Sequence, residues 1–232
     1  MACCLGRNEA AQEDRISQLP GDVKDRILEF LDTRSAARTA LLSNQWKDVW
    51  FHHGRLVIDW EFQLPLEEER GKPSATVSNT ISDILFLRSG PVKKFGLHIK
   101  EGLIPLQSDI DRWCLFLSRN GVEEFSLCIC PRLSNDYNLP VCIVSCPTIK
   151  ILSLDNLFID FSVKSRPGSI FPGVKSVNFC GIIFLHVATG IVYTIPNLEK
   201  LFITLCDWNN FLINAPKLKT MEVMYVPLCG CD

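Results

Sequence analysis

The sequence predicts a mixed α/β fold in which three short amino-terminal helices precede a parallel β-sheet built from repeats. Two observations support this prediction. Residues 14–51 carry apolar side chains at helical spacing, and one pattern of apolar and variable positions recurs from Val92 onward. Of the 232 residues, 47% are apolar and 22% are charged, so the composition is globular, with room for one or two domains.

Composition and cysteine spacing exclude several classes of function. The net charge is −2, and lysine and arginine form no run along the chain, so no nucleic-acid partner is expected. The eleven cysteines include C-x-C pairs at Cys128/Cys130 and Cys229/Cys231, but no paired zinc-binding set, so neither a metal nor a cofactor is expected. We interpret the cysteines as reduced, buried thiols of a protein in the cytoplasm or the nucleus.

One long uncharged stretch raises the question of a membrane. Residues 176–198 hold no charged side chain and are long enough to span a bilayer. However, the stretch is rich in Val, Ile and Phe, contains Pro196 and keeps the phase of the repeats. The amino-terminal residues show no apolar run of the signal-peptide type. We therefore expect residues 176–198 to be repeat core, and no membrane partner.

The amino-terminal segment predicts three short helices. The first begins at Pro20, whose missing N–H costs nothing there, and the second follows a cap at Asp32 or Thr33 and runs to about Leu42. Ser43 can cap the third helix. Such short helices cannot bury their apolar surface among themselves, so a partner is expected. The apolar residues at helical spacing are Val23, Ile27, Phe30 and Leu31 in the first helix and Trp46, Val49 and Trp50 in the third.

This segment resembles an F-box. The resemblance rests on Leu19-Pro20-x-Asp22-Val23, then Ile27-Leu28 and Leu31, then Leu41-Leu42-Ser43 and Trp46-Lys47-x-Val49-Trp50, in F-box order and spacing. It implies docking on a Skp-type adaptor, which links an F-box protein to a cullin. The alternative is a helical cap that seals the following domain, with Val23 and Phe30 inside it. The adaptor-binding residues that the resemblance implies are Leu19, Pro20, Val23, Ile27, Leu31, Leu41, Leu42, Trp46 and Trp50.

A short connecting region follows Gly54. Residues 55–62 alternate loosely between apolar and polar side chains, which predicts a strand. Residues 66–74 are charged and contain Pro and Gly, so they predict a loop and a candidate boundary. Residues 77–89 then carry apolar side chains at helical spacing, which predicts a helix.

From Val92 onward the pattern apolar-x-x-apolar-x-apolar occurs six times, at steps of 30, 27, 25, 24 and 20 residues. A period of about 20–30 residues with this core is the leucine-rich-repeat signature, in which each repeat supplies one short parallel strand. Residues 110–117 predict a helix in one returning segment, and the later returns read as irregular. The eighteen apolar slots are Val92, Phe95, Leu97, Val122, Phe125, Leu127, Ile149, Leu152, Leu154, Val174, Val177, Phe179, Leu198, Leu201, Ile203, Leu218, Met221 and Val223.

The repeats extend the resemblance to plant F-box/leucine-rich-repeat proteins of the FBD class. It rests on residues 109–113 and 117–122, on Ser145-Cys146-Pro147, and on Ile213-Asn214-Ala215-Pro216-x-Leu218. That class usually continues into further repeats and a carboxy-terminal FBD module, and we expect this module to be absent here. The implied domains are an F-box at 14–54, a strand, charged loop and helix at 55–91, and leucine-rich repeats at 92–232.

The resemblance implies a non-catalytic substrate receptor of an SCF-type E3 ubiquitin ligase, whose repeats bind a target protein. No phosphate-binding glycine motif or nucleophile elbow is present, so no catalytic residue is expected. The alternative is a repeat scaffold, or a truncated decoy that binds the adaptor without delivering a substrate. The expected target-binding residues lie between the inward slots of the strands, at His98, Ser126, Ser153, Asp155, Asn178, Thr204 and Glu222.

Overall fold

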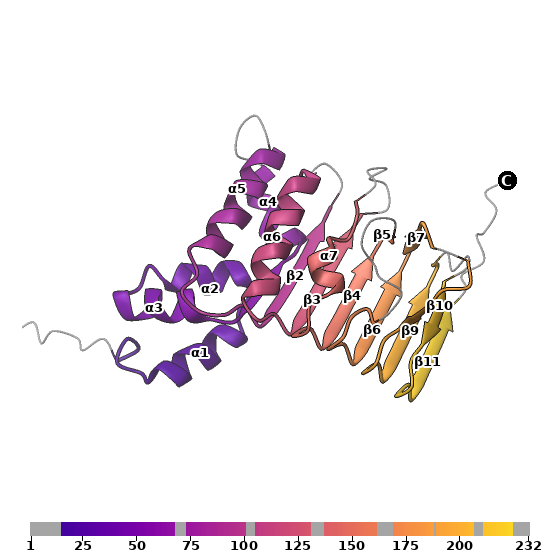
Figure 1. Cartoon of the computed structure of the whole chain (residues 1–232). Coiled ribbons are helices and arrows are strands. Elements are labelled where there is room, and N and C mark those ends of the chain that lie inside the picture. The colour runs from indigo at the N-terminus through magenta and orange to yellow at the C-terminus, as the bar shows by residue number, and fades with distance from the viewer. Residues whose placement is uncertain are drawn as a thin grey trace, which may run out of the picture. The chain divides into compact units, whose positions relative to one another are not determined.

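The chain forms two compact units in a computed structural model, residues 1–53 and residues 54–232 (Figure 1). The residues that the structure describes are 15–67, 73–100, 105–130, 137–161, 169–187, 189–206 and 211–224. The predicted α/β class is confirmed, because helices form the first unit and a parallel sheet forms the core of the second.

The first unit contains three short helices. Helix α1 (Gly21–Glu29) follows Pro20, as predicted. Helix α2 (Thr33–Thr39) begins where the Asp32 carboxylate accepts the backbone N–H of Ser35 at 2.9 Å. It ends before residue 42, because residues 40–42 turn back through hydrogen bonds to carbonyls three residues earlier. Helix α3 (Asn44–His52) is capped by Ser43, as predicted.

The segment after Gly54 differs from one prediction. Strand β1 (Arg55–Ile58) forms, but helix α4 (Trp60–Glu67) replaces the second half of the strand expected at 55–62. The reason is Asp59, whose carboxylate accepts the backbone N–H of Phe62 at 2.9 Å and so caps a helix. Most of the charged loop expected at 66–74 lies outside the described residues. Helix α5 (Pro73–Phe86) follows it, and both sides belong to the second unit.

A seven-stranded sheet forms the core of the second unit, and all its neighbouring strands are parallel. Its order in space is its order in sequence, as stacked repeats require. All six predicted repeat strands are present, and β1 adds a seventh at one end. The strands are β1, β2 (Lys94–Ile99), β3 (Glu124–Ile129), β4 (Ile151–Asp155), β6 (Ser176–Cys180), β9 (Lys200–Thr204) and β11 (Thr220–Met224).

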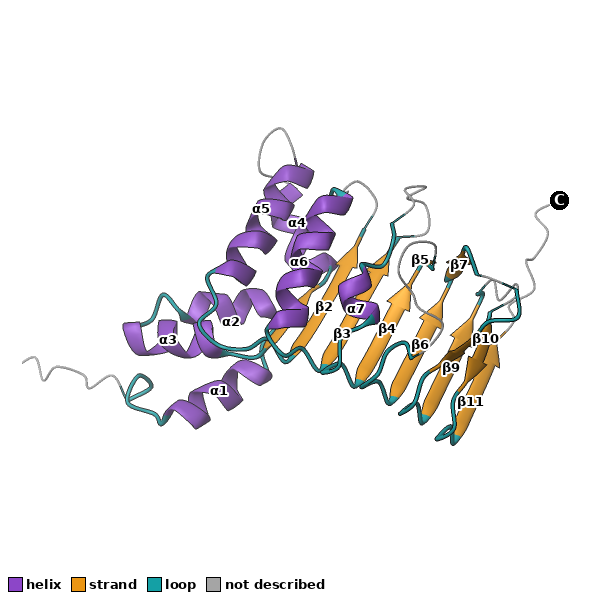
Figure 2. Ribbon diagram, viewed as in Figure 1, coloured by secondary structure: helices purple, strands orange, loops and turns teal. Residues whose placement is uncertain are grey.

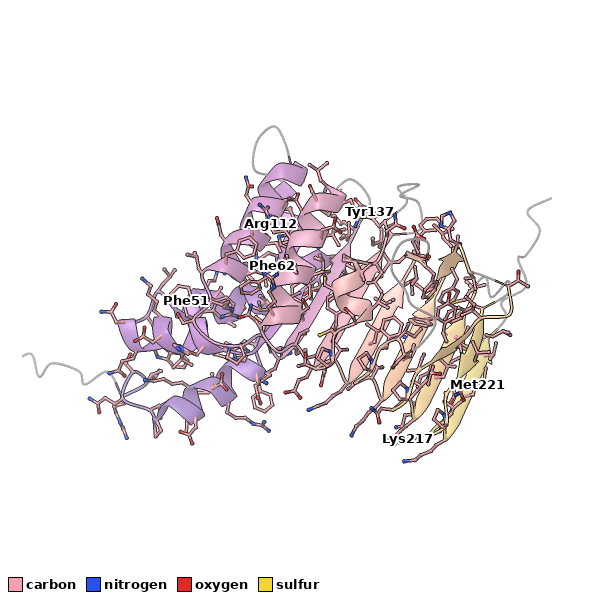
Figure 3. All side chains as sticks on the ribbon, viewed as in Figure 1. Phe51, Phe62, Arg112, Tyr137, Lys217 and Met221 are labelled. Atoms are coloured by element: carbon pink, nitrogen blue, oxygen red, sulfur yellow. The ribbon has the colours of Figure 1, made fainter. Side chains whose placement is uncertain are left out.

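The apolar slots of the first five repeats are all buried, with exposed fractions of 0–4%. The last repeat differs, because among the described residues β11 pairs with β9 on one side and with no strand on the other. Its residues Met221 and Val223 are 57% and 41% exposed, and together with residues of β9 they line an apolar hollow of about 430 Å³. Met221 is labelled on β11 in Figure 3.

The returning segments cover one face of the sheet (Figure 2). Helix α5 and helix α6 (Gln107–Arg119) belong to the first returns, and α6 contains the predicted helix at 110–117. Helix α7 (Val141–Val144) is a single turn. The later returns are more regular than expected, because they contain two small parallel sheets. These sheets pair β5 (Phe158–Asp160) with β7 (Ile183–Leu185), and β8 (Val192–Thr194) with β10 (Leu212–Asn214).

The uncharged stretch 176–198 belongs to this repeat unit. Strands β6, β7 and β8 all lie within it. Across the described ranges, no helix combines the length and the apolar character that crossing a bilayer requires.

Candidate adaptor-binding and target-binding surfaces

One side of α1 is fixed inside the helical unit. Leu28 is fully buried and Lys24 is only 3% exposed. The Lys24 ammonium donates to the carbonyl oxygen of Ser17 at 2.6 Å and to Oε1 of Gln45 at 2.8 Å, and it lies 5.8 Å from the centre of the Trp46 ring. These contacts orient α1, because a buried ammonium needs hydrogen-bond partners and its partners sit on neighbouring segments.

The opposite side of α1 carries exposed apolar side chains. Val23, Ile27 and Phe30 are 40%, 37% and 78% exposed, and they recur at helical spacing. With Asp22 and Arg26 they line an open hollow of about 430 Å³. The Arg26 guanidinium lies 5.3 Å from the centre of the Phe30 ring, so a cation borders the apolar stripe. We call these five residues the α1 surface.

The structure divides the nine residues that the F-box resemblance implies. Pro20, Val23, Ile27, Leu41 and Leu42 are exposed, whereas Leu19 and Leu31 are half-buried. By contrast, Trp46 and Trp50 are 2% and 6% exposed, so they belong to the interior and not to an accessible surface. They are buried because α3 turns both indoles inward, where Trp46 lies beneath Lys24.

Phe30 is an exposed apolar residue that the F-box resemblance does not assign to the adaptor. Phe30 is the most exposed of the three apolar residues of the α1 surface, whereas the sequence alone does not decide between core and surface for it. Its spacing from Ile27 and Val23 indicates that Phe30 is exposed, because it places these three residues on one stripe of α1. Lys24 and Leu28 lie on the other stripe, which is buried.

The predicted target-binding residues share one face of the seven-stranded sheet. On β2, β3, β4, β6 and β9, inward apolar residues alternate with exposed or half-buried ones, apart from the buried Gly96, so the second set forms a face of its own. We call it the open face. Strand register aligns Ser126, Ser153, Asn178 and Glu222 in one row and His98, Asp155 and Thr204 in the next.

A shallow hollow lies on the open face between β1 and β4. It measures about 280 Å³ and includes Gly96. Gly96 lies between Val57 and Ser126 in the register of the sheet and has no side chain to fill the space between theirs. His98, Ser126 and Ser153 from the predicted set line it, and Lys94, Glu124 and Ile151 join them from the adjoining row. Lys94, Glu124 and Ile151 lie outside the predicted set, which holds positions between or after the last two apolar slots of a repeat and not the position before them.

Asp155 lies between two thiols on the open face. Register places it between Cys128 and Cys180, and the Cys128 thiol donates to its Oδ2 at 3.2 Å. Burial first, and then this hydrogen bond and the negative charge of Asp155, raise the pKa of Cys128 to about 12. Burial and the same charge raise the pKa of Cys180 to about 11. Both thiols are therefore protonated and weakly nucleophilic at neutral pH.

We expect Asp155→Asn to make these two thiols more reactive. Removing the carboxylate charge lowers the pKa of Cys128 and Cys180, although burial keeps both above the usual value. Alkylation by iodoacetamide at about pH 8.5, followed by mass spectrometry, should then accelerate about tenfold for each pKa unit lost. Cys142 serves as an internal control, because its raised pKa arises from burial with Asp111, not Asp155, nearby. Unchanged rates at Cys128 and Cys180 would contradict the role of Asp155.

Comparison with known proteins identifies the first unit. Residues 16–57 match the F-box domain family. An F-box/FBD/LRR-repeat protein of Arabidopsis thaliana is 31% identical over 94% of this chain and 49% of its own length. An F-box/LRR-repeat protein of the same plant is 30% identical over 92% of this chain and 56% of its own length. No solved structure matches the chain.

The match to the F-box family covers all three helices and most of β1, and the match to the relatives extends through the repeats. The chain spans about half the length of the curated relatives that it matches. It is thus a chain with an F-box domain at residues 16–57, followed by a parallel-stranded repeat unit, and it is homologous over most of its length to the F-box/LRR-repeat and F-box/FBD/LRR-repeat proteins of Arabidopsis thaliana.

Proposed function

We propose that the chain is a substrate-receptor subunit of an SCF-type cullin-RING ubiquitin ligase. In this proposal the α1 surface binds a Skp-type adaptor, which links the chain to a cullin, and the open face binds the target protein. The chain itself is not catalytic. It accelerates ubiquitin transfer by holding the target lysine near the ubiquitin-charged enzyme, which converts a bimolecular encounter into a reaction within one assembly.

The observation that carries the proposal is the exposed apolar stripe of α1. Val23, Ile27 and Phe30 lie in the segment that matches the F-box family, and F-box domains generally bind Skp1-type adaptors. A contiguous exposed apolar surface on so small a helical unit marks a protein interface. None of the seven described cysteines is joined in a disulfide, and we place the chain in the cytoplasm or the nucleus, where thiols stay reduced.

We expect the double substitution Ile27→Ala and Phe30→Ala to weaken binding of a Skp-type adaptor. Removing well-placed apolar anchors costs about 2 kcal/mol or more, which corresponds to roughly a thirtyfold loss of affinity. Because both side chains are exposed, the unit should stay folded. Isothermal titration calorimetry gives the affinity, and a thermal unfolding curve of each variant reports folding.

Leu106→Ala is the matched control, because Leu106 is an apolar residue of the repeat unit with 69% exposure. It should bind the adaptor like the unaltered chain. A folded double variant with unchanged affinity would remove the α1 surface from the interface. If the unaltered chain fails to bind the adaptor and does not co-purify with a cullin, the ligase proposal is wrong.

A further inference from the structure

The repeats bring dispersed lysines together along one edge of the sheet. The residue before each strand donates its backbone N–H to the equivalent carbonyl of the preceding repeat, so these residues form a continuous line. This line and the first residues of the strands lie at the amino-terminal edge of the sheet. We call the charged residues of this edge from β2 to β11, together with Lys217 just upstream of Lys219, the amino-edge strip: Lys93, Lys94, Lys150, Lys175, Lys200, Lys217 and Lys219, with Glu123, Glu124 and Glu199.

The amino-edge strip is strongly positive. Seven lysines face three glutamates, an excess of four positive charges in a chain whose net charge is −2. All seven lysines are exposed. Figure 3 shows Lys217 extending from this edge, where further nitrogen-tipped side chains point away from the sheet. The sequence shows no lysine run because the repeat spacing of 20–30 residues separates these positions along the chain.

The three glutamates do not neutralise the strip. Glu123 is shared between Lys93, at 2.9 Å, and Lys150, and these two ammonium groups lower its pKa to about 2. Glu124 pairs with Lys94 and Glu199 with Lys219, each at 2.6 Å. Within the described part of the chain, Lys175, Lys200 and Lys217 form no ion pair with a carboxylate. The excess charge therefore concentrates along β6, β9 and β11.

We propose that the amino-edge strip binds a carboxylate-rich, extended segment of the target protein. This proposal rests on the proposed function, because it names the chemistry of the target that the repeat unit would hold. Strands lie about 4.7–4.9 Å apart, so the edge from β2 to β11 spans about 24 Å, the length of roughly seven extended residues. A row of positive charges on this scale complements a run of Asp and Glu side chains.

The side-chain type favours carboxylates over phosphates. From β2 to β11 the strip contains lysines and no arginine, and Arg55 lies beyond it, at the start of β1 in register with Lys94. The strip therefore offers separate point charges and lacks the planar fork that grips a phosphate by two hydrogen bonds. The interleaved glutamates also disfavour a continuous phosphate backbone, because each would face a like charge. A run of acidic side chains can avoid the glutamates of the strip, since each carboxylate changes its rotamer independently of the others.

The test is binding of fluorescein-labelled octaglutamate to the full chain, followed by fluorescence anisotropy at ~50 mM salt, where screening is weak. An uncharged octapeptide of serine and glycine should bind much more weakly. Lys175→Gln with Lys200→Gln should weaken octaglutamate binding about fivefold to tenfold, since each lost surface charge contributes up to ~1 kcal/mol. Raising the salt to ~300 mM should abolish the difference between the two peptides.

The matched control is Lys100→Gln with Arg112→Gln. It also removes two positive charges from the repeat unit, but Lys100 follows the carboxy-terminal end of β2 and Arg112 lies on α6. It should bind octaglutamate like the unaltered chain. Equal losses in both variants, or no loss in the strip variant, would overturn the proposal. Tighter binding of single-stranded octathymidine than of octaglutamate would also overturn it and assign the strip to nucleic acid.

Adaptor binding separates this proposal from the proposed function. A strip variant that binds the adaptor normally is folded, and its loss of octaglutamate binding then supports the strip. If the chain binds the adaptor but not octaglutamate, the acidic-segment proposal fails and the receptor proposal stands. If it binds octaglutamate but not the adaptor, the strip is a binding surface but not that of a ligase receptor, and the target assignment fails.

Discussion

Replacing Phe125 by alanine is expected to destabilise the repeat unit by about 3–5 kcal/mol, the usual cost of emptying a buried aromatic site. Phe125 is 2% exposed on β3, and its ring stacks on Phe95 with ring centres 6.0 Å apart. The loss is large compared with the ~5–15 kcal/mol that stabilises a typical domain. Because each repeat contacts only its neighbours, a cavity at β3 weakens the packing on both sides of it.

The measurement is urea unfolding followed by circular dichroism, and the midpoint should fall steeply. Leu115→Ala on α6 is the control, because Leu115 is 40% exposed and alanine is a good helix former. Its midpoint should change little. Equal midpoints for Phe125→Ala and the unaltered chain would mean that neighbouring side chains fill the cavity without a loss of stability. The interior would then be less tightly packed than the burial of Phe125 indicates.

Gly173→Ala is expected to cost about 3 kcal/mol for the opposite reason, overpacking. A Cβ atom at this position would lie 2.1 Å from the carbonyl oxygen of Pro147 and 2.9 Å from that of Ile149. Both atoms belong to the backbone of the preceding repeat, so no side-chain rotation can relieve the clash. The two repeats must move apart, and the hydrogen bonds from Lys175 and Ser176 to the Lys150 carbonyl stretch with them.

Gly96→Ala is the matched control for Gly173→Ala. Its Cβ would meet the Val57 side chain at 3.5 and 3.7 Å, an ordinary contact, and alanine is favoured over glycine within a strand. This variant should be as stable as the unaltered chain or slightly more stable. Thermal unfolding of both variants compares them directly, and a Gly173→Ala variant as stable as Gly96→Ala would contradict the close approach of the two repeats.

The sheet could be predicted from the sequence because its signal repeats. Fifteen of the eighteen slots are buried, and each copy supports the same register, so a single irregular residue could not mislead the assignment. The small sheets formed by β5, β7, β8 and β10 could not be predicted in the same way. Each of these strands has three residues, which is too short to show an alternation of apolar and polar side chains.

The other differences between the prediction and the structure arise where a single local contact overrides the pattern of apolar residues. The apolar run after Arg55 favours a strand, but the single hydrogen bond from Phe62 to Asp59 starts a helix and ends the strand at Ile58. At the candidate sites, the sequence located α1 but could not tell which stripe of it faces outward. The contacts of Lys24 with Ser17 and Gln45 decide that, and they depend on residues far apart in the chain. The lysines of the amino-edge strip likewise become neighbours only through the register.

The change of the returning segments from helices to strands affects the curvature of the repeat unit. Packed helices such as α5 and α6 stand about 8–10 Å apart, whereas the strands beneath them stand about 4.7–4.9 Å apart, so the first repeats are wedge-shaped. The later returns pair β5 with β7 and β8 with β10 at strand spacing, so those repeats are nearly flat slabs. The open face is therefore concave at β2 and β3 and nearly flat towards β11. A rounded target surface would fit the concave part, and a flat target surface would fit the part near β11.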